Sequence, residues 1–172
     1  MNIDPFLVWL ESTALSQWVI GSPSLLAFPG ILTLHAIGMG FAAGISAVLD
    51  LRILGAAPGV QLSEIRRFLP ILWLGFWVNA VSGVLLLIGY PTKALTNPVF
   101  YLKLSLIATA MVLLVKISRL AFDDTVLSGA EIDPDRLRRM RPLAIASLVC
   151  WAGAVTAGRL LAYTYTRLTA AG

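Results

Sequence analysis

Charge, histidine and cysteine are all scarce in this chain of 172 residues. Only 13% of the residues are charged and 58% are hydrophobic, whereas an ordinary soluble domain has roughly 25% and about 45–50%. The single cysteine, Cys150, excludes an intramolecular disulfide and a cluster of thiolate metal ligands. A chain of this length supports one core, so we expect a single integral membrane domain over residues 1–172.

Motifs of the common soluble enzymes are also missing. The sequence has no glycine-rich phosphate loop, no His-Glu-x-x-His and no serine in a nucleophile elbow, so no catalytic residue is assigned. The formal net charge is +4, and the charges lie between apolar blocks and not in one patch. This distribution argues against a nucleic-acid-binding surface.

Four apolar stretches are long enough to cross a hydrocarbon layer of about 30 Å. Each must be helical, because an open strand in lipid leaves its backbone groups unpaired. The sequence therefore predicts an all-α four-helix bundle whose partner is the lipid bilayer, with spans at about 24–49, 68–90, 100–122 and 142–164.

Proline and capping residues suggest where these helices begin. Ser22-Pro23 and Asn97-Pro98 are expected to cap the first and third spans, and Asp133-Pro134 is expected to begin a short separate helix. Pro29 and Pro70 lie inside their predicted spans, where we expect each to bend its helix.

The N-terminal segment at about 5–20 predicts a helix that does not span. Polar residues such as Glu11 interrupt it, while Phe6, Trp9 and Trp18 give it an apolar side. We expect an amphipathic helix lying in the membrane interface. The first residues carry no positive charge, so a cleaved signal peptide is not expected.

Basic residues set the expected orientation, because Lys and Arg collect in cytoplasmic links. The link between the first two spans and the link between the last two hold most of them, so both termini are expected outside. The basic residues in these two links are Arg52, Arg66, Arg67, Arg136, Arg138, Arg139 and Arg141.

His35 is the only histidine, and it lies inside the first predicted span. Neutral imidazole is a good axial ligand for haem iron and a carrier of protons, and polar residues in membrane spans are candidate sites by default. A row of small residues at Ala36, Gly40 and Gly44 would let a flat macrocycle or a helix approach closely. The alternative is that the glycines only pack helices and that His35 hydrogen-bonds across the bundle.

Lys103 and Arg159 lie at the same outer level of the predicted bundle as His35. Together they would form a cationic pocket for a carboxylate such as a haem propionate or for a lipid headgroup. Alternatively, each side chain snorkels to the interface and binds nothing. Asn79, in the second span, is expected to hydrogen-bond to a neighbouring helix or to His35, and Tyr101 fits an aromatic belt.

Asp50 and Arg52 flank the inner end of the first span, where we expect a helix end and a cytoplasmic anchor. On this interpretation no acidic side chain is buried in the spans. A buried Asp or Glu is common in transporters, so its absence counts against transport.

The residues in 30–54, with an early histidine and a closing Asp-Leu-Arg, resemble an uncharacterised bacterial inner-membrane family of four-span proteins. The stretch 97–104 and Gly158-Arg159 are the other matching segments. This resemblance implies a multi-pass protein of the bacterial inner membrane, and it carries no activity.

A more distant similarity is to the copper-resistance protein D family and to the haem-binding, membrane-type protoporphyrinogen oxidase family. In the latter, a first-span histidine is followed later by an aromatic-His-x-Lys-Leu pattern. The matching stretch here is 100–104: His35 and Lys103 match, and Tyr101 stands where the second histidine would be. The resemblance implies haem b with His35 as the metal ligand, and a second ligand from Tyr101 or from a homodimer partner.

The sequence thus predicts a haem-binding or redox-associated membrane protein, with His35 on the iron and Lys103 and Arg159 on anionic groups. Two alternatives stay open. One is a non-catalytic subunit that docks in a larger membrane complex through small-residue helix faces, and the other is a small metal or anion transporter component.

Overall fold

Long helices dominate the chain, as the apolar stretches predict. The computed structural model describes residues 5–122 and 134–170, and every element in these two ranges is a helix. Four of the helices have the length and hydropathy of membrane spans. The chain is therefore an all-α, multi-pass membrane protein, and the predicted four-helix bundle is confirmed. The spanning helices are α3 (Phe28–Leu54), α4 (Leu62–Gly89), α6 (Pro98–Ala121) and α8 (Pro134–Ala170).

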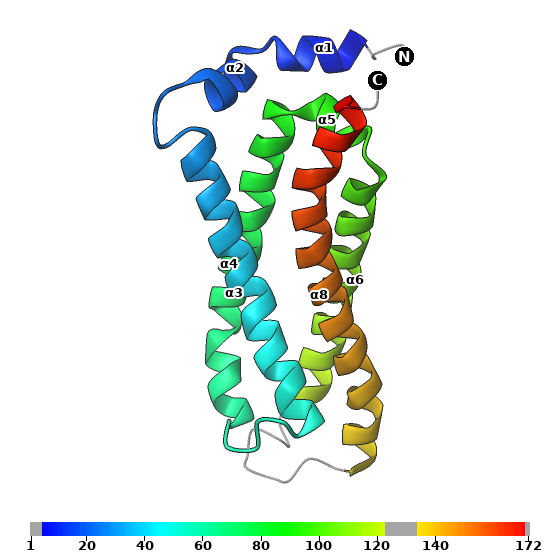
Figure 1. Cartoon of the computed structure of the whole chain (residues 1–172). Coiled ribbons are helices and arrows are strands. Elements are labelled where there is room, and N and C mark those ends of the chain that lie inside the picture. The colour runs from blue at the N-terminus through cyan, green and yellow to red at the C-terminus, as the bar shows by residue number, and fades with distance from the viewer. Residues whose placement is uncertain (1–4, 123–133, 171–172) are drawn as a thin grey trace.

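The four long helices run side by side in one bundle (Figure 1). The most extensive packing is between α3 and α4 and between α6 and α8, and α3 also packs against α8. Both termini lie at one end, which we call the terminal end, near α1 (Pro5–Glu11), α2 (Ala14–Gly21) and α5 (Pro91–Leu95). The opposite end holds the α3–α4 connection between Arg52 and Arg66, and we call it the arginine-rich end.

The N-terminal segment forms two helices where the sequence predicts one. Thr13 separates them because its hydroxyl accepts a hydrogen bond from Ser16 N at 3.3 Å and so caps α2. Glu11 Oε1 accepts a bond from Thr92 N at 3.4 Å, which ties α1 to α5. Helix α2 packs against α4, so the pair lies across the terminal end of the bundle (Figure 1).

The start of α3 differs from the predicted cap. Ser22 is the C-cap of α2, and α3 begins only at Phe28. Pro29 therefore sits in the first turn of α3, where its missing N–H leaves no bond unmade, and not inside the span. The prediction for Asn97 is confirmed, because its side chain accepts a bond from Val99 N at 3.0 Å.

Two helices extend beyond their apolar parts. Helix α4 begins at Leu62 and continues through Pro70. Helix α8 begins at Pro134 and continues through Pro142, so the predicted short helix is its first part; Asp133 lies outside the described residues. Hydropathy indicates only the part of a helix that faces lipid. The polar turns at the start of a helix depend on capping and packing, which hydropathy does not measure.

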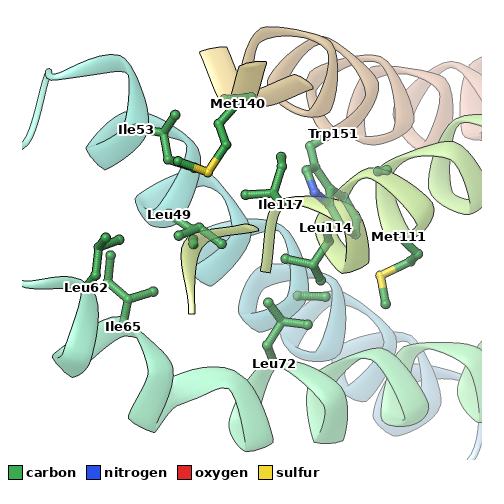
Figure 2. Close-up of a cluster of buried hydrophobic side chains, with 14 residues drawn as sticks. Leu49, Ile53, Leu62, Ile65, Leu72, Met111, Leu114, Ile117, Met140 and Trp151 are labelled. Atoms are coloured by element: carbon green, nitrogen blue, oxygen red, sulfur yellow. The ribbon is translucent and has the colours of Figure 1, made fainter. Parts of the chain in front are cut away.

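The main hydrophobic core lies in the arginine-rich half of the bundle. Figure 2 shows large side chains from all four long helices meeting there. Leu49 of α3, Leu72 of α4, Ile117 of α6 and Met140 of α8 are fully buried. Large aliphatic side chains therefore set the helix spacing in this half.

Candidate functional site

Glycine allows α3 and α4 to meet closely in the terminal half. A Cβ atom added to Gly38 would lie 2.6 Å from Gly75 O and 2.7 Å from Asn79 N, and one added to Gly75 would lie 2.7 Å from Phe41 Cβ. No other residue fits at such distances without moving the backbone. Because His35 lies one turn before Gly38 on α3, this contact sets its imidazole against α4.

Helix α4 binds one side of the His35 ring. His35 Nδ1 lies 3.0 Å from Asn79 O and 3.2 Å from Ser82 Oγ. Asn79 Nδ2 donates to His35 O at 2.8 Å, although it also lies 3.3 Å from Nδ1, and Ser82 Oγ donates to Val78 O at 2.5 Å. A carbonyl oxygen only accepts hydrogen bonds, so Nδ1 carries the hydrogen and donates it to Asn79 O.

Helix α6 binds the other side of the ring. Lys103 Nζ lies 3.3 Å from His35 Nε2. An ammonium group has donors only, so Nε2 accepts with its lone pair. The two contacts agree on one state, a neutral imidazole with its hydrogen on Nδ1. The predicted residues His35 and Lys103 are thus brought together, and both are half-buried.

Helix α8 passes Lys103 at a glycine. A Cβ atom added to Gly158 would lie 3.7 Å from Lys103 Nζ, which is ordinary contact. Among the residues that the structure describes, no carboxylate pairs with Lys103, whose hydrogen bond goes to His35. The site therefore holds a basic side chain inside a membrane span without an acidic partner.

Tyr101 and Arg159 are not drawn into this contact. The Tyr101 hydroxyl donates to Leu95 O at 3.0 Å, and its side chain is 53% exposed. Arg159 follows Gly158 on α8, but its side chain is exposed. The ligand roles expected for these two residues stay predictions.

Sequence reasoning missed two residues that shape the pocket of His35. Ser82 contacts Nδ1, and a Cβ atom added to Gly83 would lie 3.1 Å from His35 Cε1. Gly75, Asn79, Ser82 and Gly83 follow a helical spacing of four, seven and eight, which places them on one face of α4. This face of small and polar residues was the sequence signal that could have identified the pocket. The expected hydrogen bond of Asn79 is confirmed, since its Nδ2 donates to His35 O.

A groove lies beside the site between α3 and α4, with a volume of about 330 Å³. Ser82, whose Oγ contacts His35 Nδ1, is one of its lining residues, and the others are hydrophobic. The lining residues are Ile31, Leu34, Trp77, Val78, Val81, Ser82 and Leu85.

Asp50 differs from its expected role. It is fully buried on α3 at 0% exposure, and neither carboxylate oxygen has a hydrogen-bond partner. The expectation that Asp50 marks the helix end, and that the spans bury no acidic side chain, was therefore wrong. The nearby helix end is formed by Gly55, whose φ of 88° closes α3 in a left-handed conformation. One objection to transport is removed, and the transporter hypothesis stays a prediction.

Comparison with known protein families, with characterised proteins and with solved structures found no match to this chain. No group of three or more His, Cys, Asp or Glu side chains comes together in the described part of the chain. A metal held at His35 would therefore have to bring further ligands of its own, as the iron of a haem does.

Proposed function

We propose that this chain is a haem-binding, redox-associated membrane protein in which His35 is the axial ligand. The observation that carries the proposal is the contact of His35 with Lys103. Nε2 has a lone pair, and the ammonium beside it has no carboxylate partner among the described residues. A haem b would supply a stronger partner for each group, because it has an iron for imidazole and propionates for a cation.

The described residues at the site can supply one axial ligand, which is His35. A ligating histidine usually donates its other N–H to a carbonyl or carboxylate, which fixes the tautomer and the ring, and His35 Nδ1 has such a partner in Asn79 O. Lys103 is bonded to Nε2, so its flexible side chain has to turn away before Nε2 binds iron. The iron would supply one-electron redox chemistry, and the second ligand would come from outside the described contacts.

The location proposed is the bacterial inner membrane, with both termini outside. The support is the charge distribution, because Arg52, Arg66 and Arg67 lie at one end and the termini at the other. Arginine-rich links are retained in the cytoplasm. His35 and Lys103 then lie in the outer half of the bilayer.

Absorption spectra of the detergent-purified protein test the proposal, with the protein produced under adequate haem supply. We expect a Soret band in the oxidised protein and α and β bands after dithionite reduction. His35→Ala should lose all three bands and still insert, whereas Arg159→Gln should keep them because it leaves the proposed iron ligand His35 in place. A folded, colourless wild-type protein would contradict the proposal, and so would bands that survive in His35→Ala.

A second candidate is a docking subunit or homodimer, favoured by the outer face of α3. Ala36, Gly40 and Gly44 are exposed, and a Cβ atom added to either glycine meets nothing within 4 Å. Rows of small residues let helices of two chains approach closely in lipid. Gly40→Leu with Gly44→Leu should then remove a co-purifying partner or the dimer. An unchanged complex would argue against this face.

A further inference from the structure

The second buried polar site of the bundle surrounds Asp50. Its carboxyl group lies one turn before the end of α3, and its neighbours Leu49 and Ile53 belong to the core cluster of the arginine-rich half (Figure 2). The residue is 0% exposed, and both oxygens lack a hydrogen bond. An acidic side chain is thus enclosed by hydrocarbon.

Ser147 on α8 is the polar residue placed opposite this carboxyl, because Trp151 and Ser46, one turn away on the same two helices, are bonded to each other. It too is 0% exposed, and its Oγ makes no hydrogen bond. One turn away on the same two helices, Trp151 Nε1 donates to Ser46 Oγ at 2.9 Å. The α3–α8 interface therefore carries two polar pairs, of which one is bonded and the other is not.

No charged side chain in the described part of the chain neutralises Asp50. On its own helix, Arg52 Nε donates to Val60 O at 2.6 Å and so is engaged elsewhere. No hydrogen bond or ion pair joins the Asp50 carboxylate to any residue within 5–122 and 134–170. The described charged side chains of the other helices in the arginine-rich half are exposed, apart from Arg136 on α8, which is half-buried. The exposed ones are Glu64, Arg66 and Arg67 on α4, Lys116 and Arg119 on α6, and Asp135, Arg138, Arg139 and Arg141 on α8.

An ionised carboxylate is unfavourable in these surroundings, because it loses water and gains no counter-ion. Adding a proton to one oxygen removes the charge. It also creates an O–H donor, which satisfies the Ser147 hydroxyl and the acid together. Two oxygen-bearing side chains give fewer ligands than a metal cation such as Ca²⁺ or Mg²⁺ requires.

We propose that Asp50 is a proton-binding site, a neutral carboxylic acid hydrogen-bonded to Ser147, which exchanges its proton with water at the arginine-rich end. Asp50 lies five residues before Gly55, which follows the last residue of α3 and is exposed. The arginine-rich end is therefore the nearer end of the bundle from which water can reach the carboxyl. The proposal does not depend on haem, because its residues are separate from His35 and Lys103.

Infrared spectroscopy of the purified full chain in neutral buffer tests the proposal. Only 9 side chains are Asp or Glu, so the carbonyl stretch of one protonated acid can be resolved in a difference spectrum. We expect one such band in the wild type, its loss in Asp50→Asn, and its shift after transfer to D₂O. Glu64→Gln is the matched control, because Glu64 is exposed and pairs with Arg67 at 3.4 Å, and it should keep the band.

Three results would overturn the proposal. One is a wild-type protein without the band, and another is a band that Asp50→Asn retains. The third is a band that does not shift in D₂O, because that proton would not exchange. Ser147→Ala gives an independent test that leaves Asp50 in place, since it should move the frequency of the band by removing the partner of the acid.

Discussion

His35 and Asp50 lie on one helix, about four turns or 22 Å apart, yet their surroundings are opposite. In the terminal half, both nitrogens of His35 have partners, one on α4 and one on α6. In the arginine-rich half, neither oxygen of Asp50 has one. The contacts of His35 fix the orientation of its ring. The Asp50 carboxyl has no such contacts, and on our proposal its charge depends on whether it binds a proton.

The residues that pack the interior also differ between the two halves. Around His35, glycines bring the α3 and α4 backbones together and leave room for polar side chains. Around Asp50, large aliphatic side chains fill the interior (Figure 2). A ligand site is therefore expected where glycine makes space, and a proton site where the core excludes water. Four substitutions test this contrast.

Gly38→Val should have the largest effect. Its side chain would collide with the α4 backbone at Gly75 O and Asn79 N, and overpacking of this kind costs up to about 3 kcal/mol. We expect that loss in the free energy of unfolding measured in mixed detergent micelles, together with loss of any haem. Gly40→Ala is the control because a Cβ atom there meets nothing, and it should change stability by less than about 1 kcal/mol. Equal changes in the free energy of unfolding of the two variants would show that the close contact at Gly38 does not stabilise the terminal half.

Lys103→Met should weaken haem binding about tenfold, which corresponds to about 1.4 kcal/mol. The reason is that Lys103 is the cation beside Nε2, and its loss leaves a propionate without a partner. Arg159→Gln should change the affinity less than about twofold, since its side chain is exposed. Haem titrations of both variants measure the difference, and a larger effect at Arg159 would move the anionic contact to α8.

Asn79→Ala should lower the free energy of unfolding by about 1 kcal/mol. It removes the 2.8 Å bond from Nδ2 to His35 O, and interhelical hydrogen bonds in membranes contribute about 0.6 to 1.7 kcal/mol. Ser105→Ala is the matched control, because Ser105 is exposed and bonds only within its own helix, to Leu102 O. If both variants unfold alike, the α3–α4 polar contact does not stabilise the terminal half.

Asp50→Asn should have the smallest effect, a stability change below about 1 kcal/mol. The amide is neutral like the protonated acid and can still bond to Ser147. Haem absorption should not change, because the site lies in the other half of the bundle. A loss of several kcal/mol in the same unfolding assay would show that the ionised form of Asp50 is needed, and would contradict the proton site.

Composition was enough to predict the fold class, because apolar stretches of spanning length leave only the helix in lipid. It did not locate the helix ends at Leu62 and Pro134, where polar turns continue the helices past their apolar parts. The division of the N-terminal segment by Thr13 depends on one capping bond, which a hydropathy pattern does not contain.

The candidate site was predicted in part. His35 and Lys103 stood out because polar residues in spans are costly, and the bundle does bring them together. The rotation of each helix about its axis could not be predicted from the sequence, so the bond of Tyr101 to Leu95 O and the exposure of Arg159 were not foreseen. Asp50 was misjudged for the same reason, because its position near a helix end did not show that it faces α8.

Haem titration into protein produced without added haem tests the central claim most directly. Soret absorbance would be followed for the wild type, His35→Ala and Asp50→Asn under the same conditions. The account predicts saturable binding to the wild type and equally to Asp50→Asn, with none to His35→Ala. Equal titration curves for the wild type and His35→Ala would contradict it, because they would show that the His35 site is not where haem binds.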